Sequence, residues 1–320
     1  MANDRIHEVI AIEEHYLDPE VAAEFDARSE RPSKIVERLN DLGEARLKDM
    51  DDAGIDIQVL SHGAPSTQRM DAETAVRLAG NANDRLSETV TANPTRFAAF
   101  AALPTPDPKA AADELERCVT KLGFKGAMVH GLTNGVFFDD MQFWPIFERA
   151  AALDVPLYVH PARPHQDVID IYYKEYIDDF PSLLTSSWGY TVETATQGIR
   201  LVLSGVFDKY PGLQIILGHL GESLPFSLWR INQGLERPGN KSIAFRDTFC
   251  EHFHITTSGN FSDPAMLCCL QEMGADRIMF SVDYPFVENK PGTEWMERIS
   301  LSIDDKEKIL SGNAKKLLKM

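Results

Sequence analysis

Five residues with metal-binding side chains stand at the ends of predicted strands. Glu13 and His15 are two positions apart at the end of the first apolar run, so their side chains lie on the same side of that strand. His160 ends a later run, and His219 and Asp283 each directly follow another. Imidazole nitrogens and carboxylate oxygens together suit a divalent ion such as Zn²⁺, Mn²⁺ or Mg²⁺. The sequence therefore predicts one divalent metal ion at these residues, with room left for water or substrate.

Each histidine also has a structural alternative. A single histidine at a strand end is more often a hydrogen-bonded part of the scaffold than a metal ligand. The convergence of four strand ends favours the metal site, because Glu13 and Asp283 would be costly to bury without a cation. Glu222, three residues after His219, either orients that imidazole ring and tunes its proton affinity or is an acidic residue in the first turn of a helix.

Short apolar runs alternate along the chain with segments of helical periodicity. The runs predict eight strands, at residues 8–13, 55–61, 97–103, 126–130, 155–160, 213–218, 253–258 and 277–282. Near-continuous apolar strands separated by helices are typical of a parallel sheet buried on both faces. Eight of them favour a closed (β/α)8 TIM barrel over a doubly wound sheet, since Glu13-Glu14-His15 stands where a Rossmann-type fold has a glycine-rich turn.

The helical segments complete one catalytic barrel domain over residues 1–320. They are predicted at about 34–53, 71–91, 108–122, 141–153, 191–209, 222–236, 263–274 and 304–318. Two irregular insertions, at 16–33 and 161–190, follow the ends of the first and fifth strands, on the barrel face where active sites lie. We expect these insertions to act as substrate lids or as oligomer contacts.

Residues near the predicted barrel mouth indicate a small, flat, acidic ligand. Arg163 and Arg230 offer positive charge, Trp188 and Phe286 offer apolar surfaces, and His130 stands at a strand end where it could line the pocket. Core packing or surface salt bridges are the alternative explanation for each of them.

Composition excludes several classes of partner. The formal net charge of -17 argues against nucleic acid and anionic membranes, because both require a basic face. No apolar stretch approaches the roughly 20 residues of a membrane span, and the first residues lack the apolar run of a signal peptide. The four cysteines show no metal-binding spacing and read as free thiols. We therefore expect a cytoplasmic protein.

Motifs around the predicted metal ligands resemble those of the amidohydrolase-related decarboxylases, a group that includes γ-resorcylate, 2,3-dihydroxybenzoate, salicylate and 5-carboxyvanillate decarboxylases. The likeness covers nearly the whole chain. The motifs are Glu13-x-His15, Val159-His160-Pro161, Leu217-Gly218-His219-Leu220-Gly221-Glu222 and Phe280-Ser281-Val282-Asp283-Tyr284-Pro285-Phe286. Hydrolytic amidohydrolases usually carry His-x-His on the first strand, so Glu13 in the first place favours the decarboxylase branch.

This resemblance implies non-oxidative decarboxylation of an ortho-hydroxybenzoate, with one divalent metal ion and no organic cofactor. The metal would bind the substrate carboxylate and the neighbouring phenolic oxygen. Asp283 would then donate a proton to the ring carbon that carries the carboxylate, while His219 with Glu222 supplies or stabilises the charge. Arg230 would clamp a ring hydroxyl or the carboxylate. A homodimer or homotetramer is also expected from the resemblance.

Two departures from the family pattern concern the substrate. Related chains tend to carry Asn where His130 stands, and the insertion at 161–190 lacks close correspondence, so ring substitution is left open. A hydrolase or hydratase that attacks a lactone, amide or enol with metal-bound hydroxide is the alternative function on the same barrel. A binding or scaffold protein without chemistry is the third hypothesis.

Overall fold

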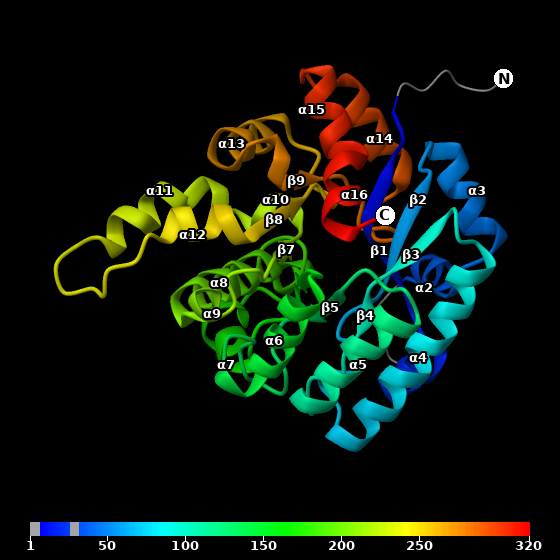
Figure 1. The fold of residues 1–320 in the computed structure, drawn as a ribbon, viewed down its shortest axis with the longest axis horizontal. Helices are drawn as coiled ribbons and strands as arrows, with labels where there is room; N and C mark the ends of the chain where they lie inside the picture. The colour runs from blue at the N-terminus through cyan, green and yellow to red at the C-terminus, as the bar shows by residue number, and fades with distance from the viewer. Residues whose placement is uncertain (1–6, 26–31) are drawn as a thin grey trace.

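The strands lie towards the centre of the molecule with the helices around them (Figure 1), in a computed structural model that describes residues 7–25 and 32–320. Paired strands run parallel to one another. The strands are β1 (Ile10–Tyr16), β2 (Ile57–His62), β3 (Phe97–Ala99), β4 (Ala101–Ala102), β5 (Ala127–His130), β6 (Leu157–His160), β7 (Ile215–Leu217), β8 (Phe253–Thr256) and β9 (Ile278–Met279).

Hydrogen bonds close these strands into a barrel. One ladder joins β1, β2 and β3, and a second joins β4 to β9 in chain order. Only Phe100 separates β3 from β4, and its amide donates to the carbonyl of Leu60 in β2 at 2.9 Å, so β3 and β4 together are the third predicted strand. At the other seam, Glu14 of β1 forms a bridge with Tyr284, and the His15 amide donates to the Tyr284 carbonyl at 2.7 Å. The predicted (β/α)8 barrel is confirmed.

Side chains fill the inside of the barrel. Alternate residues of each strand point inward, and they pack with two residues of the C-terminal helix. This inner cluster consists of Ile10, Ile12, Val59, Ala98, Phe100, Met128, Tyr158, Ile216, Met279, Ala314 and Leu318. A larger apolar layer lies between the strands and the helices. Because the interior is packed, room for substrate exists only at the carboxyl ends of the strands.

The outer layer of helices follows the strands along the chain. Its members are α1 (Pro19–Glu24), α2 (Ser33–Asn40), α3 (Glu44–Ala53), α4 (Ala72–Ala92), α5 (Pro108–Lys121), α6 (Trp144–Leu153), α7 (Gln166–Val168), α8 (Gly189–Ser204), α9 (Val206–Lys209), α10 (His219–Glu222), α11 (Leu224–Leu235), α12 (Phe245–His252), α13 (Asp263–Met273), α14 (Asn289–Arg298), α15 (Ile303–Glu307) and α16 (Asn313–Leu318).

Two predicted helices are interrupted by turns. The helix predicted at 34–53 is α2 and α3, separated by a turn in which the Asp41 carboxylate accepts the Gly43 amide at 2.7 Å. The helix predicted at 191–209 breaks at Gly205, whose φ of 83° lies in the left-handed region that favours glycine. Because the apolar periodicity continues on both sides of such a short turn, the sequence predicts one long helix where the structure has two.

The helices α12 and α14 are absent from the sequence prediction. Helix α14 contains Pro291 and Gly292 near its start, residues that ordinarily indicate a loop. Helix α12 spans only two turns, too short for a clear periodic pattern. Together, α11 and α12 extend from the body as the α11–α12 arm, residues 224–252 (Figure 1).

Both predicted insertions carry short helical segments. The insertion at 161–190 contains α7, a π-helical turn at Ile169–Tyr173 and a 3₁₀ turn at Pro181–Leu184. The insertion at 16–33 contains α1, whose first turn is capped by Asp18, and its residues 26–31 lie outside the described part of the chain.

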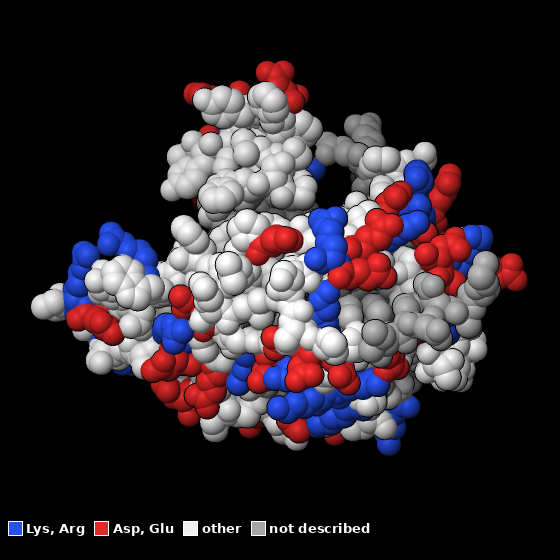
Figure 2. All heavy atoms as spheres, turned by 90° about the horizontal axis from the view of Figure 1, so that it is seen from above, with Lys and Arg blue, Asp and Glu red and all other residues white. Residues whose placement is uncertain are grey.

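Charges of both signs are mixed on the surface. On the face seen in Figure 2, Lys and Arg side chains lie next to Asp and Glu rather than in a separate basic region. The cysteines Cys118, Cys250, Cys268 and Cys269 are free thiols, as predicted. Among the helices of the described residues, none has the length and apolar character needed to cross a membrane.

Asn313 joins the C-terminal helix to the barrel and is a test of this packing. Its buried amide donates to the carbonyls of Ala275 and Ile278, both at 2.7 Å. We expect Asn313→Ala to lower the free energy of unfolding by about 1–3 kcal/mol, because the buried Ile278 carbonyl and the partly buried Ala275 carbonyl both lose their donor. Urea denaturation followed by circular dichroism measures the change.

Asn240→Ala is the matched control. The exposed Asn240 also donates to two backbone carbonyls, those of Gly234 near the end of α11 and of Arg237 in the turn that follows, but it does so at the surface. We expect a change within about 0.5 kcal/mol for this variant. Equal losses in the two variants would contradict the role assigned to Asn313.

Candidate metal centre

Four of the predicted metal ligands lie together at the barrel mouth. Glu13, His15, His160 and Asp283 each offer a donor atom, and these atoms all lie within 4.8 Å of one another. His160 Nε2 is 3.3 Å from Glu13 Oε1, and His15 Nε2 is 3.3 Å from Asp283 Oδ1. The four residues come from β1, β6 and the loop after β9. We call this group the donor cluster.

A β-bulge decides which residues of β1 face the cluster. The inward residues Ile10 and Ile12 alternate as expected for a strand. The register with β2 then shifts between Ala11 and Glu14, and after this shift Glu13 and His15 face the barrel mouth. Simple alternation from Ile12 would have placed Glu14 inside instead, so the bulge re-aims the metal-binding side chains.

Hydroxyl groups satisfy one oxygen of the Glu13 carboxylate. Its Oε2 accepts from the hydroxyls of Tyr158, Ser258 and Thr256, the last at 3.3 Å. Its Oε1 is buried and finds no hydrogen-bond partner among the described residues, and the same holds for His15 Nε2. A carboxylate oxygen and an imidazole nitrogen without a hydrogen bond in a buried site are groups that a divalent cation would satisfy. The residues present therefore fit the predicted metal.

Hydrogen bonds at the far nitrogens orient the imidazole rings. His160 Nδ1 lies 2.7 Å from the Pro161 carbonyl oxygen. A carbonyl only accepts, so Nδ1 carries the proton and Nε2 keeps its lone pair for a metal. His15 Nδ1 likewise contacts the hydroxyl of Ser61 at 3.1 Å, while its Nε2 faces the cluster. Burial lowers the pKa of His160, which keeps this ring neutral and able to coordinate.

His219 and Glu222 form a pair at the edge of the donor cluster. His219 Nδ1 is 2.7 Å from Glu222 Oε1, while its Nε2 lies 3.9 Å from Glu13 Oε1 and 3.8 Å from Asp283 Oδ2. Glu222 is buried and also accepts from the Thr191 hydroxyl at 2.9 Å. These contacts favour the ring-orienting role for Glu222 over a helix-dipole role. His219, the fifth predicted ligand, is not part of the tight donor cluster.

The backbone around this pair is unusual. His219, Leu220, Glu222 and Ser223 have φ values between 51° and 63°, and Asp283 has a φ of 72°. Non-glycine residues in this left-handed region are uncommon and concentrate at functional sites. Here they turn the chain so that His219 and Asp283 both face the cluster.

Gly218 allows the Glu13 carboxylate to lie close to β7. A Cβ at this position would lie 2.7 Å from Glu13 Oε2 and 3.2 Å from the Tyr158 hydroxyl. Any side chain would therefore displace the carboxylate from its hydroxyl partners.

Charge is distributed unequally in the site. Burial on its own would raise the pKa of Asp283, but the neighbouring imidazole rings of His15 and His219 outweigh burial and hold that pKa below its ordinary value. Burial on its own would lower the pKa of His219, but the carboxylates of Glu222 and Glu13 outweigh burial and raise it. The arrangement therefore places a proton on His219 next to an ionised Asp283.

Two predicted substrate residues border the cluster. The Phe286 ring lies 5.8 Å from the His15 ring and is 43% exposed, so it presents an apolar face beside the cluster. His130 is buried, and its Nδ1 lies 3.1 Å from His160 Nδ1. His130 thus contacts a predicted ligand as well as standing near the pocket.

The structure leaves three other predicted substrate residues on the surface. Trp188 is half exposed at the start of α8, and Arg230 is exposed on the α11–α12 arm. Arg163 is also exposed, and its carbonyl accepts from the Arg69 guanidinium at 3.4 Å.

Several functional side chains were not predicted from the sequence. The hydroxyl partners of Glu13 could have been found, because Tyr158 is two residues before His160 and so points to the same side of β6. Thr256 and Ser258 share a side of the next-but-one strand in the same way. Glu14, by contrast, gives no such signal.

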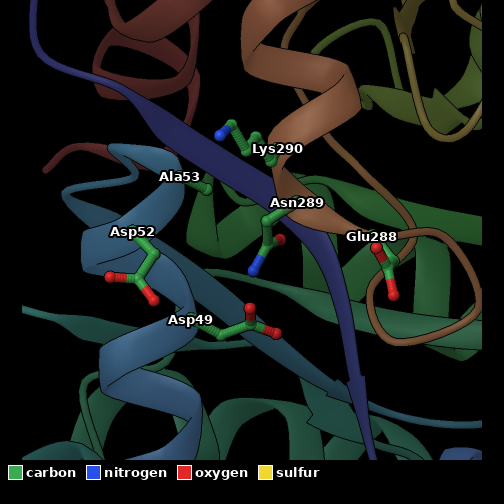
Figure 3. A pocket seen from close by; sticks show the side chains of 6 residues that line it. All are labelled: Asp49, Asp52, Ala53, Glu288, Asn289 and Lys290. Atoms are coloured by element: carbon green, nitrogen blue, oxygen red, sulfur yellow. The ribbon is translucent and has the colours of Figure 1, made fainter.

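A hollow of about 430 Å³ lies outside the barrel between α3 and α14. Figure 3 shows its lining residues Asp49, Asp52, Ala53, Glu288, Asn289 and Lys290. Its carboxylates are paired with nearby cations: Arg38 with Asp49 and Glu288, and Lys48 with Asp52. No residue of the donor cluster lines this hollow, which is therefore separate from the candidate site.

Comparison with known proteins agrees with this geometry. The family model described as amidohydrolase matches residues 14–320. The chain is 42% identical over 329 residues to gamma-resorcylate decarboxylase of Polaromonas sp., an alignment that covers 97% of this chain and 98% of that protein.

Solved structures of similar proteins share the fold. A 2,6-dihydroxybenzoate decarboxylase complexed with 2,6-dihydroxybenzoate has a TM-score of 0.89 at 40% identity and covers 98% of this chain and 100% of its own. A dihydroxybenzoic acid decarboxylase from Polaromonas sp., with bound manganese and the inhibitor 2-nitroresorcinol, has a TM-score of 0.89 at 41% identity, covering 98% and 97%. The resemblance seen in the motifs is confirmed over almost the whole length, and the chain belongs to the amidohydrolase family.

Proposed function

We propose that this protein is a divalent-metal-dependent decarboxylase of hydroxylated aromatic carboxylic acids, a carboxy-lyase that needs no organic cofactor. The observation that carries the proposal is the donor cluster with two buried donor atoms that lack a hydrogen bond, Glu13 Oε1 and His15 Nε2. Close relatives are gamma-resorcylate decarboxylases, and one related structure binds manganese. An ortho-hydroxybenzoate such as 2,6-dihydroxybenzoate is the proposed substrate, and Mn²⁺ the proposed ion.

The residues proposed to hold the metal are Glu13, His15, His160 and Asp283, with His219 at the edge. When bound, the ion supplies a Lewis acid for the substrate carboxylate and its neighbouring phenolic oxygen. Phe286 offers a face against which an aromatic ring can pack beside His15. His130 supports this wall of the site through its contact with His160.

Proton transfer is proposed to run through His219 and Asp283. His219 holds a proton because Glu222 raises its pKa, and its Nε2 lies 3.8 Å from Asp283 Oδ2. Asp283 receives this proton when the bound substrate excludes water and raises the proton affinity of the carboxylate, and it delivers the proton to the ring carbon that bears the substrate carboxylate. The bond to the carboxylate then breaks, its electron pair restores the aromatic ring, and carbon dioxide leaves. The proton replaces the lost carboxylate on the ring.

Arg163, Trp188 and Arg230 are kept as proposed substrate contacts. All three lie on exposed segments that follow β6 and β7, so their contribution depends on how these segments pack in the assembled protein. Under this proposal, these three side chains reach the substrate only in the oligomer.

The first test of the proposal is an assay of metal-reconstituted protein. We expect carbon dioxide release from one or more of 2,6-, 2,3- and 2,4-dihydroxybenzoate, salicylate and 5-carboxyvanillate. Chelation should abolish turnover and Mn²⁺ should restore it, because the substrate carboxylate is proposed to bind through the metal ion that the donor cluster holds. Spectrophotometry of substrate loss together with metal analysis gives both readouts.

Parallel reconstitution with Zn²⁺ and Mg²⁺ identifies the ion. Absence of turnover on the whole panel by protein with bound metal would refute the decarboxylase proposal. Hydrolysis of a lactone or amide by the same preparation would instead support the hydrolase alternative.

A second test concerns the proton donor. We expect Asp283→Asn to lower kcat by about 10²–10⁴-fold, because an amide cannot hold and deliver the proton. The variant should still bind 2,6-dihydroxybenzoate in titration calorimetry with Mn²⁺ present. Asp276→Asn, at an exposed aspartate paired with Lys308, is the matched control and should keep wild-type kcat. Retained turnover in Asp283→Asn would remove Asp283 from the proton route.

We also propose a homodimer or homotetramer, with the α11–α12 arm in an interface. Phe226 and Trp229 on α11 are 83% and 63% exposed, and residues three apart share one face of a helix. Light scattering coupled to gel filtration should give two or four chains, and Phe226→Ser with Trp229→Ser should shift the mass downwards. Ile303→Ser, an exposed apolar residue on α15, is the control. A monomeric wild-type protein would contradict this proposal.

A further inference from the structure

Glu14 is a fully buried carboxylic acid that faces away from the donor cluster. The bulge that turns Glu13 into the barrel mouth leaves Glu14 on the opposite side of β1, against the segment after β9. Outward positions of barrel strands normally carry apolar residues that pack on the helices. A carboxylic acid here is costly unless it is hydrogen-bonded.

Its partners surround one of the proposed metal ligands. Glu14 Oε1 accepts from the Ser281 hydroxyl and from the Val282 amide, each at 2.9 Å. Glu14 Oε2 accepts from the Tyr284 amide at 3.0 Å. The two amides belong to the residues directly before and after Asp283. The carboxyl group therefore holds the backbone of Asp283 from both sides.

Regular ladder pairing ends before Asp283. Strand β9 ends at Met279, and β1 then meets the following segment through the isolated bridge between Glu14 and Tyr284 and through the Glu13 amide, which donates to the Ser281 hydroxyl at 2.6 Å. The Thr257 hydroxyl exchanges hydrogen bonds with the backbone of Ser281 on the other side. Asp283 itself has a φ of 72°, a conformation that its own sequence does not favour. The bonds from Glu14 supply the constraint that a regular ladder would otherwise provide.

Arg46 supports the same arrangement from the other side. This fully buried side chain of α3 donates to the carbonyl of His15, another proposed ligand. Its guanidinium also lies 4.8 Å from the centre of the Tyr284 ring, within range of a cation–π interaction. Glu14 and Arg46 thus connect the backbones of His15 and Asp283.

We infer that Glu14 is a positioning residue for the metal centre, one that sets the place of the Asp283 carboxylate through the amides of Val282 and Tyr284. The inference rests on the proposed metal-dependent function. It requires only that both oxygens of Glu14 accept hydrogen bonds. This holds for the carboxylate and for the neutral acid alike, because a carboxyl hydroxyl oxygen still accepts. The nitrogen of a glutamine side chain does not.

The test is the affinity for Mn²⁺ of Glu14→Gln. The side-chain nitrogen of this variant must face the backbone amide of either Val282 or Tyr284. Both groups are hydrogen-bond donors, so one of the two hydrogen bonds that flank Asp283 is lost. We expect the Kd for Mn²⁺, measured by titration calorimetry on folded protein well below its Tm, to rise about 10–100-fold. Electron paramagnetic resonance of bound Mn²⁺ should show an altered ligand environment.

Glu114→Gln is the matched control. Glu114 of α5 is also largely buried and accepts from Asn83 at 2.7 Å and from Arg117 at 2.8 Å, away from the donor cluster. We expect this variant to keep the wild-type Kd, even where its Tm falls. A purely structural role for Glu14 would lower the Tm of Glu14→Gln without changing the Kd, and that result would overturn the inference.

Glu14→Asp is the second variant, for the case in which Glu14→Gln does not fold. It keeps the acid but is one methylene shorter, so it cannot reach both amides, and a wild-type Kd would again overturn the inference. The proposed function is tested separately. Wild-type protein that binds Mn²⁺ without decarboxylating any substrate refutes the function, while the comparison of Kd values still decides the role of Glu14.

Discussion

The rest of the site is arranged around the buried carboxylate of Glu13. Removing a carboxylate from water is expensive, and here only one of its oxygens is compensated, by the hydroxyls of Tyr158, Thr256 and Ser258. The other oxygen and the neighbouring His15 Nε2 are left to a cation. The metal would therefore do more than chemistry: it balances a charge that the fold has already buried.

The barrel makes this burial possible. Its interior is packed with apolar side chains, so polar groups gather at the carboxyl ends of the strands, where neighbouring parallel strands bring them within a few ångströms. Strand β9 is only 2 residues long, and at its seam with β1 the amides of Val282 and Tyr284 donate to the Glu14 side chain. Structural and chemical roles thus fall on adjacent residues of β1 that face opposite ways.

The histidines show how neighbours decide protonation where burial is similar. Burial by itself lowers the pKa of both His160 and His219. His160 has no carboxylate at its Nδ1, which contacts the Pro161 carbonyl and the His130 ring, and stays neutral as a metal ligand must. His219 is bonded to Glu222, which outweighs burial and keeps a proton available beside Asp283. Two histidines of one site are thereby suited to different roles, His160 to metal binding and His219 to proton donation.

The sequence by itself determined the barrel, the strand ends and the residue types of the metal site, because apolar periodicity is local and parallel strands bring their ends together in any closed barrel. It did not reveal the bulge by which β1 turns Glu13 and His15 to the barrel mouth, or that Trp188 and Arg230 lie exposed. Nor could it reveal the partners of Glu14, which lie up to 270 residues further along the chain. Contacts between such distant segments leave no periodic pattern, so only the tertiary structure decided them.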